Sequence, residues 1–490
     1  MFSRRRLLTG GLGAVAAWSL PKGALAAPHV ARRCHQRFEA AVANTPALDP
    51  WRSIDVERLA PTRARLEGRI PRGLRGTLYR NGPAGFERAG ARYQHWFDGD
   101  GMVQAFRLDD RGVTHFGRKV RTEKWAREEQ AGRFLFRGAG SRVPDPEPAR
   151  ANDTANPANI AVVPWGGELL ALWEAGSPYA LDPDTLSTER RITWSSETDR
   201  MPFSAHPLFD RAGRMWNFGL AQWAGKTGVL ALYQLSPERG LERTTLVPLP
   251  FPGYMHSFAM TERWLVFYLS PHVLERAREG TYVEAHAWRP ELGGRFLLVD
   301  KEDFDRREVI DAPPGFVFHF ADAHDLPGGG IALRACWSER PKAMDEDMFG
   351  VMCGERTSLD DGAHLVRFEL AGGRAAKTSG GPVGDFPVVD PRSRSPFVVL
   401  TADRELALID PKGRPRTLRA DGEVLLEEHR FVPRSARPGD GWLVGTGYDL
   451  EARASVLTVF DTASASTTPV LQATLDRRIP FGFHGWFLRA

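Results

Sequence analysis

The fold class is indicated by the stretch Ile160-Ala161-Val162-Val163-Pro164-Trp165-Gly166-Gly167-Glu168-Leu169-Leu170-Ala171-Leu172-Trp173. Two apolar runs of strand length flank a Gly-Gly turn, and this pattern predicts a pair of antiparallel strands. Similar runs recur along the chain at 264–269, 295–300, 397–400, 406–409, 442–445 and 456–461. Strand pairs spread along the whole chain, without alternating helices, predict an all-β protein.

The length of the chain narrows the architecture. Its 490 residues exceed the roughly 250–300 at which single cores stop growing, so the chain is either two domains or a repeat-built fold. Serial four-stranded sheets at this length predict a β-propeller rather than a sandwich. The repeats are too degenerate for the blades to be counted from the sequence. Helical periodicity is confined to short pieces such as 124–132 and 271–279.

The first 26 residues have the pattern of a targeting signal. Arg4, Arg5 and Arg6 precede an apolar run at 7–20, and Ala24-Leu25-Ala26 forms an A-x-A cleavage site. Ser-Arg-Arg-x-Leu-Leu resembles the twin-arginine export signal, and an ordinary secretory signal is the alternative. We therefore expect export, to the periplasm or an equivalent compartment. Residues 27–50 show little periodicity and are expected to form a linker, which leaves 51–490 for the propeller.

Charge and cysteine content exclude several classes of function. Four of the 65 basic residues and none of the 61 acidic ones lie in 1–26, so the remainder is formally neutral. No basic surface for nucleic acid is therefore expected. Cys34, Cys336 and Cys353 are an odd number without repeated spacing, which argues against a disulfide framework and a zinc ribbon.

Four histidines lie in apolar or aromatic surroundings, and we predict that they converge on one metal ion. Intervals of 50, 63 and 165 residues separate them, as expected for ligands from different blades that meet at a central axis. Imidazole suits Fe, Zn, Cu and Ni, so the ligand type alone leaves the metal open. The four segments are Phe203-Ser204-Ala205-His206-Pro207, Tyr254-Met255-His256-Ser257-Phe258, Phe318-His319-Phe320 and Phe481-Gly482-Phe483-His484-Gly485-Trp486.

Two acidic residues are candidates to hold ligand histidines. A histidine that binds a metal needs its other ring nitrogen held, usually by a carboxylate or a carbonyl. Glu174 follows an apolar strand and Glu428 lies within one, although each alone could be an ordinary acid at a strand edge. Among the other histidines, His95 and His324 are close alternatives to the ligand set. The rest are expected at the surface or in loops, namely His29, His35, His115, His272, His286, His364 and His429.

Eight short blocks resemble the motifs of the carotenoid cleavage oxygenases, in the same order, from about Ile54 to the C-terminus. The blocks are Leu78-Tyr79-Arg80-Asn81-Gly82-Pro83, His95-Trp96-Phe97-Asp98-Gly99-Asp100-Gly101-Met102, Asn156-Pro157-Ala158-Asn159 with Leu169 to Glu174, Pro178 to Pro183, Ala205-His206-Pro207, Met255-His256-Ser257-Phe258 with Phe318-His319-Phe320, Phe431-Val432-Pro433 and Gly482-Phe483-His484-Gly485.

This resemblance implies a seven-bladed β-propeller capped by loops and short helices. It implies one Fe(II) per chain, on the axis, held by His206, His256, His319 and His484. It also implies a dioxygenase that adds O2 across an alkene and cleaves the C=C bond into two carbonyl products. The Arg80 to Pro83 and Asp98 to Gly101 segments are expected only to shape turns, with aspartates that cap backbone amides.

The chain departs from the family pattern at two places. Three glutamates hold ligand histidines in the family, and two of them match Glu174 and Glu428. The third position is Asp385, one methylene shorter, so its hydrogen bond to a histidine is expected to be lost or bridged by water. The segment after His319 also differs, which keeps His324 as an alternative ligand.

The sequence leaves two classes of alkene substrate open. The 28 phenylalanines and 14 tryptophans can line a tunnel for a carotenoid or an apocarotenoid, and such a tunnel is often approached from a membrane. Members that cleave phenolic stilbenes or phenylpropenes use a lysine and a tyrosine on the substrate hydroxyl, and Lys124 and Tyr93 are the candidates in this chain. A solvated Lys124 would have no such role. A propeller that binds apolar ligands without catalysis is the alternative of a different class.

Overall fold

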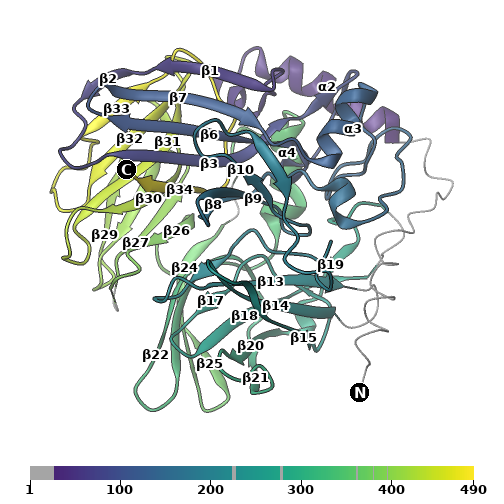
Figure 1. The fold of residues 1–490 in the computed structure, drawn as a ribbon, viewed down its shortest axis with the longest axis vertical. Helices are drawn as coiled ribbons and strands as arrows, with labels where there is room; N and C mark the ends of the chain where they lie inside the picture. Colours follow the sequence, from purple (N-terminus) through teal and green to yellow (C-terminus); the bar gives the residue numbers. More distant parts are fainter. Residues whose placement is uncertain (1–26, 223–227, 276–279, 360–361, 379, 394–395) are drawn as a thin grey trace.

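The computed structural model describes residues 27–222, 228–275, 280–359, 362–378, 380–393 and 396–490 (Figure 1). The expected export signal, 1–26, lies outside these residues. Within the described ranges, seven sheets of four to six strands follow one another along the chain. This is the arrangement of a seven-bladed propeller, so the predicted all-β architecture is confirmed.

Each blade is an antiparallel sheet, and its strands are named in the order in which they pair. The first three are β1 (Arg58–Arg63), β7 (Gly112–Lys119), β6 (Asp100–Asp109), β3 (Gly76–Gly85) and β34 (Gly485–Arg489); β11 (Thr188–Arg191), β10 (Tyr179–Leu181), β9 (Glu168–Leu172) and β8 (Ala161–Trp165); and β12 (Leu208–Phe209), β13 (Met215–Gln222), β14 (Gly228–Ser236) and β15 (Gly240–Pro248). The fourth is β16 (Gly253–Tyr254), β18 (Trp264–Leu274), β20 (Gly294–Asp300) and β21 (Arg307–Ala312), with β17 (Ala259–Met260) and β19 (His286–Trp288) also on β18.

The remaining three blades have the same plan. They are β22 (Phe316–Asp325), β23 (Ile331–Ser338), β24 (His364–Ala371) and β25 (Arg374–Lys377); β26 (Asp385–Val389), β27 (Val398–Ala402), β28 (Glu405–Ile409) and β29 (Pro415–Leu418); and β30 (Val424–Pro433), β31 (Gly441–Asp449), β32 (Ala454–Asp461), β33 (Leu471–Thr474) and β2 (Arg65–Gly68). A separate hairpin pairs β4 (Glu87–Arg88) with β5 (Ala91–Arg92).

Position within a blade explains the sequence patterns of the strands. β18 is buried along its whole length because a middle strand packs against neighbouring blades on both faces. Its first six residues, 264–269, are therefore all apolar or aromatic. The outer strand β21 is largely exposed and polar. Residues 271–274 belong to β18, so the helix expected over 271–279 is wrong for its described part.

The two ends of the chain close the ring of blades. C-terminal β34 pairs with β3 near the N-terminus, and β2 pairs with β33 of the last blade. Strands β17, β22, β26, β30, β34 and β8 contact one another in succession, and we call these strands, none of which belongs to the third blade, the inner ring. The segment just before β34 therefore lies at the inner ring, whereas the last three residues, 488–490, are exposed.

Residues 27–50 are not the expected linker. Helix α2 (Ala27–Val42) places Ala31, Phe38 and Val42 in the core, and the 3-10 helix η1 (Pro46–Trp51) follows it. The spacing of these apolar residues is helical, and Pro28 in the first turn with Pro46 after the helix obscured it in the sequence.

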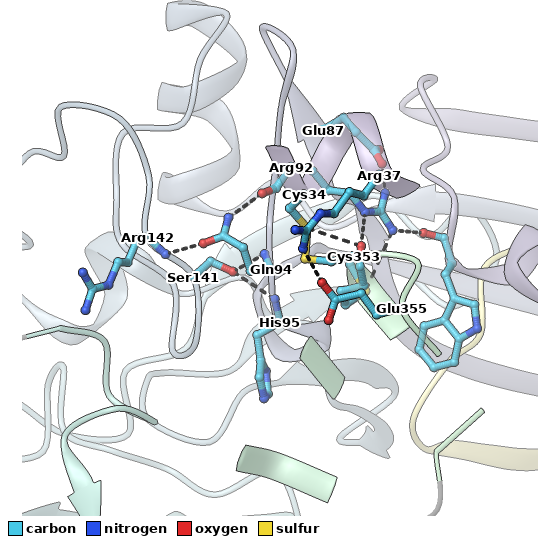
Figure 2. The surroundings of a disulfide bond; sticks show 12 residues. Cys34, Arg37, Glu87, Arg92, Gln94, His95, Ser141, Arg142, Cys353 and Glu355 are labelled. Atoms are coloured by element: carbon cyan, nitrogen blue, oxygen red, sulfur yellow. Dashed lines mark hydrogen bonds and ion pairs between the residues drawn. A yellow bond between two sulfur atoms is a disulfide. The ribbon is translucent and has the colours of Figure 1, made fainter. Parts of the chain in front are cut away.

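A disulfide joins Cys34 of α2 to Cys353, 319 residues later (Figure 2). Arg37 of α2 also pairs with Glu355, at 2.5 Å. The cysteine count disfavoured a disulfide framework, but a single bridge between distant segments leaves no spacing pattern in a sequence. The bridge attaches the N-terminal helix to the turn after helix α4 (Met348–Met352).

The helices gather on one side of the blades (Figure 1). Helix α3 (Glu123–Ala131) confirms the helix predicted near 124–132, with Thr122 accepting a hydrogen bond as N-cap and Gly132 at a φ of 61° as C-cap. A π-helical turn, η5 (Ala343–Asp347), leads into α4. Short 3-10 turns connect other elements: η2 (Trp96–Asp98), η3 (Asn152–Ala155) and η4 (Pro290–Leu292). No helix in the described part of the chain is long and apolar enough to span a membrane.

Candidate metal centre

The four predicted histidines meet at the inner ring of strands. His206 lies just before β12, His256 between β16 and β17, His319 in β22 and His484 just before β34. One ring nitrogen from each lies within 4.8 Å of the others. Residues from widely separated parts of the sequence therefore present their side chains to one point.

The facing atoms are the Nε2 nitrogens. They are 2.9 Å apart between His206 and His256, and 3.1 Å apart between His319 and His484. Burial lowers the pKa of His206 well below its ordinary value and that of His484 to about 4, so both rings are neutral at pH 7. Neutral imidazole is the form that binds a metal.

Carboxylates hold the opposite nitrogen of three rings. Glu174 lies 3.1 Å from Nδ1 of His256, Asp385 2.8 Å from Nδ1 of His319 and Glu428 3.1 Å from Nδ1 of His484. An ionised carboxylate accepts a hydrogen bond from Nδ1–H, so each of these rings has its lone pair at Nε2.

This donor set fits a metal ion. The Nε2 lone pairs of His319 and His484 face each other at 3.1 Å with no proton between them, and a cation between them would relieve their repulsion. Four uncharged nitrogen ligands suit a divalent transition metal, and three carboxylates orient them. The structure thus brings together every residue predicted at the centre.

Asp385 contacts His319 directly, so the expected loss or water bridging of this hydrogen bond is wrong. Register shifts after Asp385, so that Phe386 and Pro387 of β26 oppose a single residue of β27. Such a bulge bends the strand and redirects its side chains, and Phe386 has a left-handed φ of 54° within it. The backbone geometry makes up for the shorter side chain.

Aromatic rings surround the histidines. Phe97 stacks parallel to His256 at 6.4 Å between centroids, and Phe318 meets the same ring edge-on at 5.2 Å. Phe386 lies 5.1 Å from both His319 and His484. These rings exclude water from the histidines and provide an apolar surface beside them.

A family model described as retinal pigment epithelial membrane protein matches residues 51–489. The protein belongs to the carotenoid cleavage oxygenase family. Helix α2 and its Cys34 precede the matched residues. The four histidines and their carboxylates lie within them.

Named relatives of this carotenoid cleavage oxygenase cover most of the chain. It is 29% identical to an apocarotenoid-15,15'-oxygenase of Synechocystis, over 86% of this chain and 91% of the relative. It is 27% identical to an isoeugenol monooxygenase of Pseudomonas nitroreducens, over 86% of this chain and 93% of the relative. The solved structure of the cobalt-substituted apocarotenoid oxygenase of Synechocystis superposes with a TM-score of 0.80 at 27% identity, covering 91% of this chain and 98% of that one.

Several of the remaining histidines of the oxygenase differ from the prediction in whether they are buried or exposed. His324, the alternative ligand, is exposed in β22, and His95 is buried with Nε2 3.0 Å from the carbonyl oxygen of Met344. Four histidines expected at the surface are buried instead: His115, His272, His286 and His429. Burial of these positions depends on how their strands pack, which the local sequence does not show.

Tyr93 and Lys124 lie together, but in a buried ionic cluster. The Lys124 amino group lies 2.6 Å from Asp100 and 2.9 Å from Glu128, and 5.1 Å from the ring centre of Tyr93. The Tyr93 hydroxyl donates to Glu128 at 3.3 Å. Burial alone would lower the pKa of Lys124, but Asp100 and Glu128 hold it well above the ordinary value. The solvated alternative is wrong, whereas a role toward substrate stays a prediction.

The sequence reasoning missed two residues beside the centre. The Tyr254 hydroxyl donates to Glu174 at 3.0 Å, and burial, followed by Glu174, raises its pKa well above the ordinary value. Tyr254 is two residues before His256, so its place in the aromatic segment was its only signal.

Arg80, expected only in a turn, lies in β3 and pairs with Glu428 at 2.9 Å. Asp98 does cap backbone amides, those of Ala139 and Gly140.

Proposed function

We propose that this protein is a non-haem Fe(II) dioxygenase that cleaves a C=C bond of a carotenoid or apocarotenoid with O2 to give two carbonyl products. The observation that carries the proposal is the convergence of four histidines, three of them oriented by carboxylates, beside aromatic rings. Ferrous iron in this site would supply the activation of dioxygen.

The chain's own groups have three tasks in this reaction. Glu174, Asp385 and Glu428 keep the proton on Nδ1 of their histidines, so that Nε2 stays available to the metal. Tyr254 donates a hydrogen bond to Glu174 and fixes the orientation of that carboxylate. The apolar alkene would lie against Phe97, Phe318 and Phe386, whose rings exclude water from the reacting bond.

An apocarotenoid or carotenoid is favoured over a phenolic alkene by the state of Lys124. Its ammonium group is held by Asp100 and Glu128, and a substrate hydroxyl would have to displace one of them. The phenylpropene or stilbene alternative is kept because one relative is an isoeugenol monooxygenase. A non-catalytic propeller is disfavoured because all four ligands are present.

Export by a twin-arginine route, to the periplasm or an equivalent compartment, is part of the proposal. The Cys34–Cys353 bridge supports it, since disulfides persist in oxidising compartments. Peripheral contact with a membrane is also proposed, because a carotenoid partitions into lipid. Flotation of the mature protein with liposomes, with and without a carotenoid, tests that contact.

The central experiment is anaerobic reconstitution of the mature protein with Fe(II), followed by O2 and a panel of apocarotenoids, carotenoids, isoeugenol and hydroxystilbenes. Two carbonyl fragments from an apocarotenoid or carotenoid are expected by mass spectrometry. Cleavage of phenolic alkenes alone would replace the substrate class. Full iron loading without cleavage of any panel member would contradict the proposal.

A further inference from the structure

Two consecutive glutamates on β30 point the same way. In a regular strand, neighbouring side chains lie on opposite faces. In β30 the register shifts between Leu426 and His429, so that Glu427 and Glu428 together oppose the single residue Thr446 of β31. This bulge lets both carboxylates reach one partner.

That partner is Arg80 of β3. Its Nη1 lies 2.9 Å from Oε2 of Glu428, and its Nη2 lies 3.1 Å from Oε1 of Glu427. All three side chains are buried: Arg80 and Glu428 are 2% exposed and Glu427 is 8% exposed. Two buried carboxylates on consecutive residues would repel strongly, and the Arg80 guanidinium between them offsets this repulsion. Arg430 adds a second cation, with its Nη1 3.3 Å from Oε1 of Glu428.

The same carboxylates hold the backbone on either side of His484. The Gly482 amide donates to Oε1 of Glu427 at 2.6 Å, and the Gly485 amide donates to Oε2 of Glu428 at 2.9 Å. The Thr446 hydroxyl donates to the other oxygen of Glu427 at 2.6 Å. His484 thus lies between two anchored amides, with its ring bound to Glu428.

The glycines make this approach feasible. A methyl group on Gly485 would lie 2.4 Å from the carbonyl oxygen of Tyr79, and one on Gly82 would lie 2.4 Å from the Cα of Gly482. The segment that carries His484 therefore lies directly on β3. It leads directly into β34, whose pairing with β3 begins at Gly485 and Arg80.

We propose that Arg80 and Glu427 are positioning residues, which set the metal affinity of the centre by holding the 482–485 segment and Glu428 around His484. This inference rests on the proposed function for its consequence in the enzyme, but the contacts exist without a metal. Without the Arg80 charge, Glu427 would lose its paired cation and Glu428 would keep only Arg430, whose Nη1 lies 3.3 Å from its Oε1, so the two carboxylates would move apart. Glu428 would then no longer hold His484 in place.

The first test measures the metal site with Co(II), by titration of the apoprotein and by its electronic spectrum. Arg80→Gln is expected to weaken Co(II) binding at least tenfold and to alter the spectrum, since partners of ligand histidines are worth about 10–100-fold in metal affinity. Arg80→Lys keeps the positive charge but loses the paired N–H donors of the guanidinium. Its Co(II) affinity should therefore lie between those of Arg80→Gln and wild type. Unchanged Co(II) affinity in folded Arg80→Gln would overturn the proposal.

A matched control is Arg92, which is also fully buried but pairs with Glu87 and with the carbonyl oxygens of Trp51 and Met352. Arg92→Gln should lower the melting temperature and leave Co(II) affinity within about twofold of wild type, because none of its partners contacts a ligand histidine. Equal losses of affinity in both variants would mean that any buried arginine has the effect, and would contradict the positioning role.

A double-mutant cycle tests whether Arg80 affects Co(II) affinity through His484. In a His484→Ala background, Arg80→Gln should cause no further loss of Co(II) affinity, because the ligand it positions is gone. Additive losses would overturn the proposal. Glu427→Gln gives the same comparison if Arg80→Gln does not fold, with a several-fold loss of affinity expected.

A metal-free readout separates this proposal from the proposed function. Hydrogen exchange of the apoprotein should be faster at the Gly482 and Gly485 amides in Arg80→Gln than in wild type, and unchanged there in Arg92→Gln. Unchanged exchange would overturn the positioning role even in an active enzyme. Failure of the wild-type protein to bind a metal would overturn the proposed function, and the exchange rates would then decide alone whether Arg80 holds the 482–485 segment.

Discussion

Asp385 Oδ1 lies 2.8 Å from Nδ1 of His319, a direct contact made by an aspartate where a longer glutamate was expected to be needed. Burial would raise the pKa of Asp385, but His319 outweighs burial and holds it below the ordinary value. The Phe386 amide also donates to the same oxygen, at 2.8 Å. The carboxylate is thus ionised and fixed from two sides.

Lengthening Asp385 should not improve the centre. Asp385→Glu adds a methylene to a buried, well-packed position next to a bulge, so iron affinity should fall rather than rise. Asp385→Asn, of the same size, should weaken iron binding about 10–100-fold because the charge on the His319 partner is lost. Metal content after equilibration at limiting Fe(II) checks both. A higher iron content in Asp385→Glu would show that the direct contact is inadequate.

Removal of a direct ligand should have a larger effect. His484→Ala is expected to weaken iron binding so far that the protein loses its iron on gel filtration, since one of four ligands is lost. The matched control is His324→Ala, because His324 is exposed in β22 and was the alternative ligand. Iron analysis after gel filtration measures both variants, and loss of iron in His324→Ala alone would reverse the ligand assignment.

Reduction of the Cys34–Cys353 bridge should destabilise the protein without affecting the metal. The two cysteines are 319 residues apart, and typical disulfides stabilise by about 2–4 kcal/mol. Cys34→Ser should lower the free energy of unfolding by that order, as measured by urea titration. Non-reducing digestion and mass spectrometry should find the two peptides linked in the exported protein. Their separation in such a sample would exclude the bridge.

Lys124→Met should cause a general loss of stability. The substitution breaks the buried contacts of Lys124 with Asp100 and Glu128 and leaves Arg88 as the remaining cation beside both carboxylates. Breaking a buried pair costs about 3–5 kcal/mol. Turnover of an apocarotenoid and of a hydroxystilbene should fall by equal factors at a temperature where the variant is folded. A selective loss with the hydroxystilbene would support phenol recognition by Lys124.

Acid should destabilise the protein through its buried histidines. Burial lowers the pKa of His115 to about 3 and that of His429 to about 4, whereas an unfolded histidine titrates near about pH 6.5. Above that pH both states are neutral and this stability is fully present. As the pH falls from about 6.5 toward 3, the unfolded chain binds protons that the native protein does not, so stability is lost.

His115→Gln should therefore make the acid slope of the unfolding free energy shallower by about 1.4 kcal/mol per pH unit between about pH 4 and 6. His324→Gln, at an exposed position, should leave the slope unchanged. Urea titrations at several pH values measure it. An unaltered slope in His115→Gln would show that His115 is not buried as a neutral ring.

The architecture could be predicted from the sequence because strand pairs are local features. Alternating apolar runs and turns, such as 160–173, need no tertiary information, and they indicated an all-β propeller that the structure confirms. The four histidines of the candidate metal centre could also be selected from the sequence, because their neighbours are apolar, aromatic or glycine residues and because they lie in family motifs.

Tertiary structure decided how those residues act. Bulges on β22, β26 and β30 place Phe318 and His319, the residues after Asp385, and Glu427 and Glu428, and a bulge depends on pairing with the next strand. Asp385 was expected to be too short because side-chain length is visible in a sequence, whereas the path of the backbone is not.

Burial and long-range pairing were likewise hidden. Helix α2 was expected as a linker, and the Cys34–Cys353 bridge joins residues with no sequence relation. Arg80 was expected only in a turn, and its pairing with Glu427 and Glu428 depends on the contact between β3 and β30. Local pattern and residue chemistry thus established which elements form and which groups can bind a metal, and both are present in the sequence. The contacts that orient those groups depend on strand register and on the closure of the ring, and only the folded chain contains them.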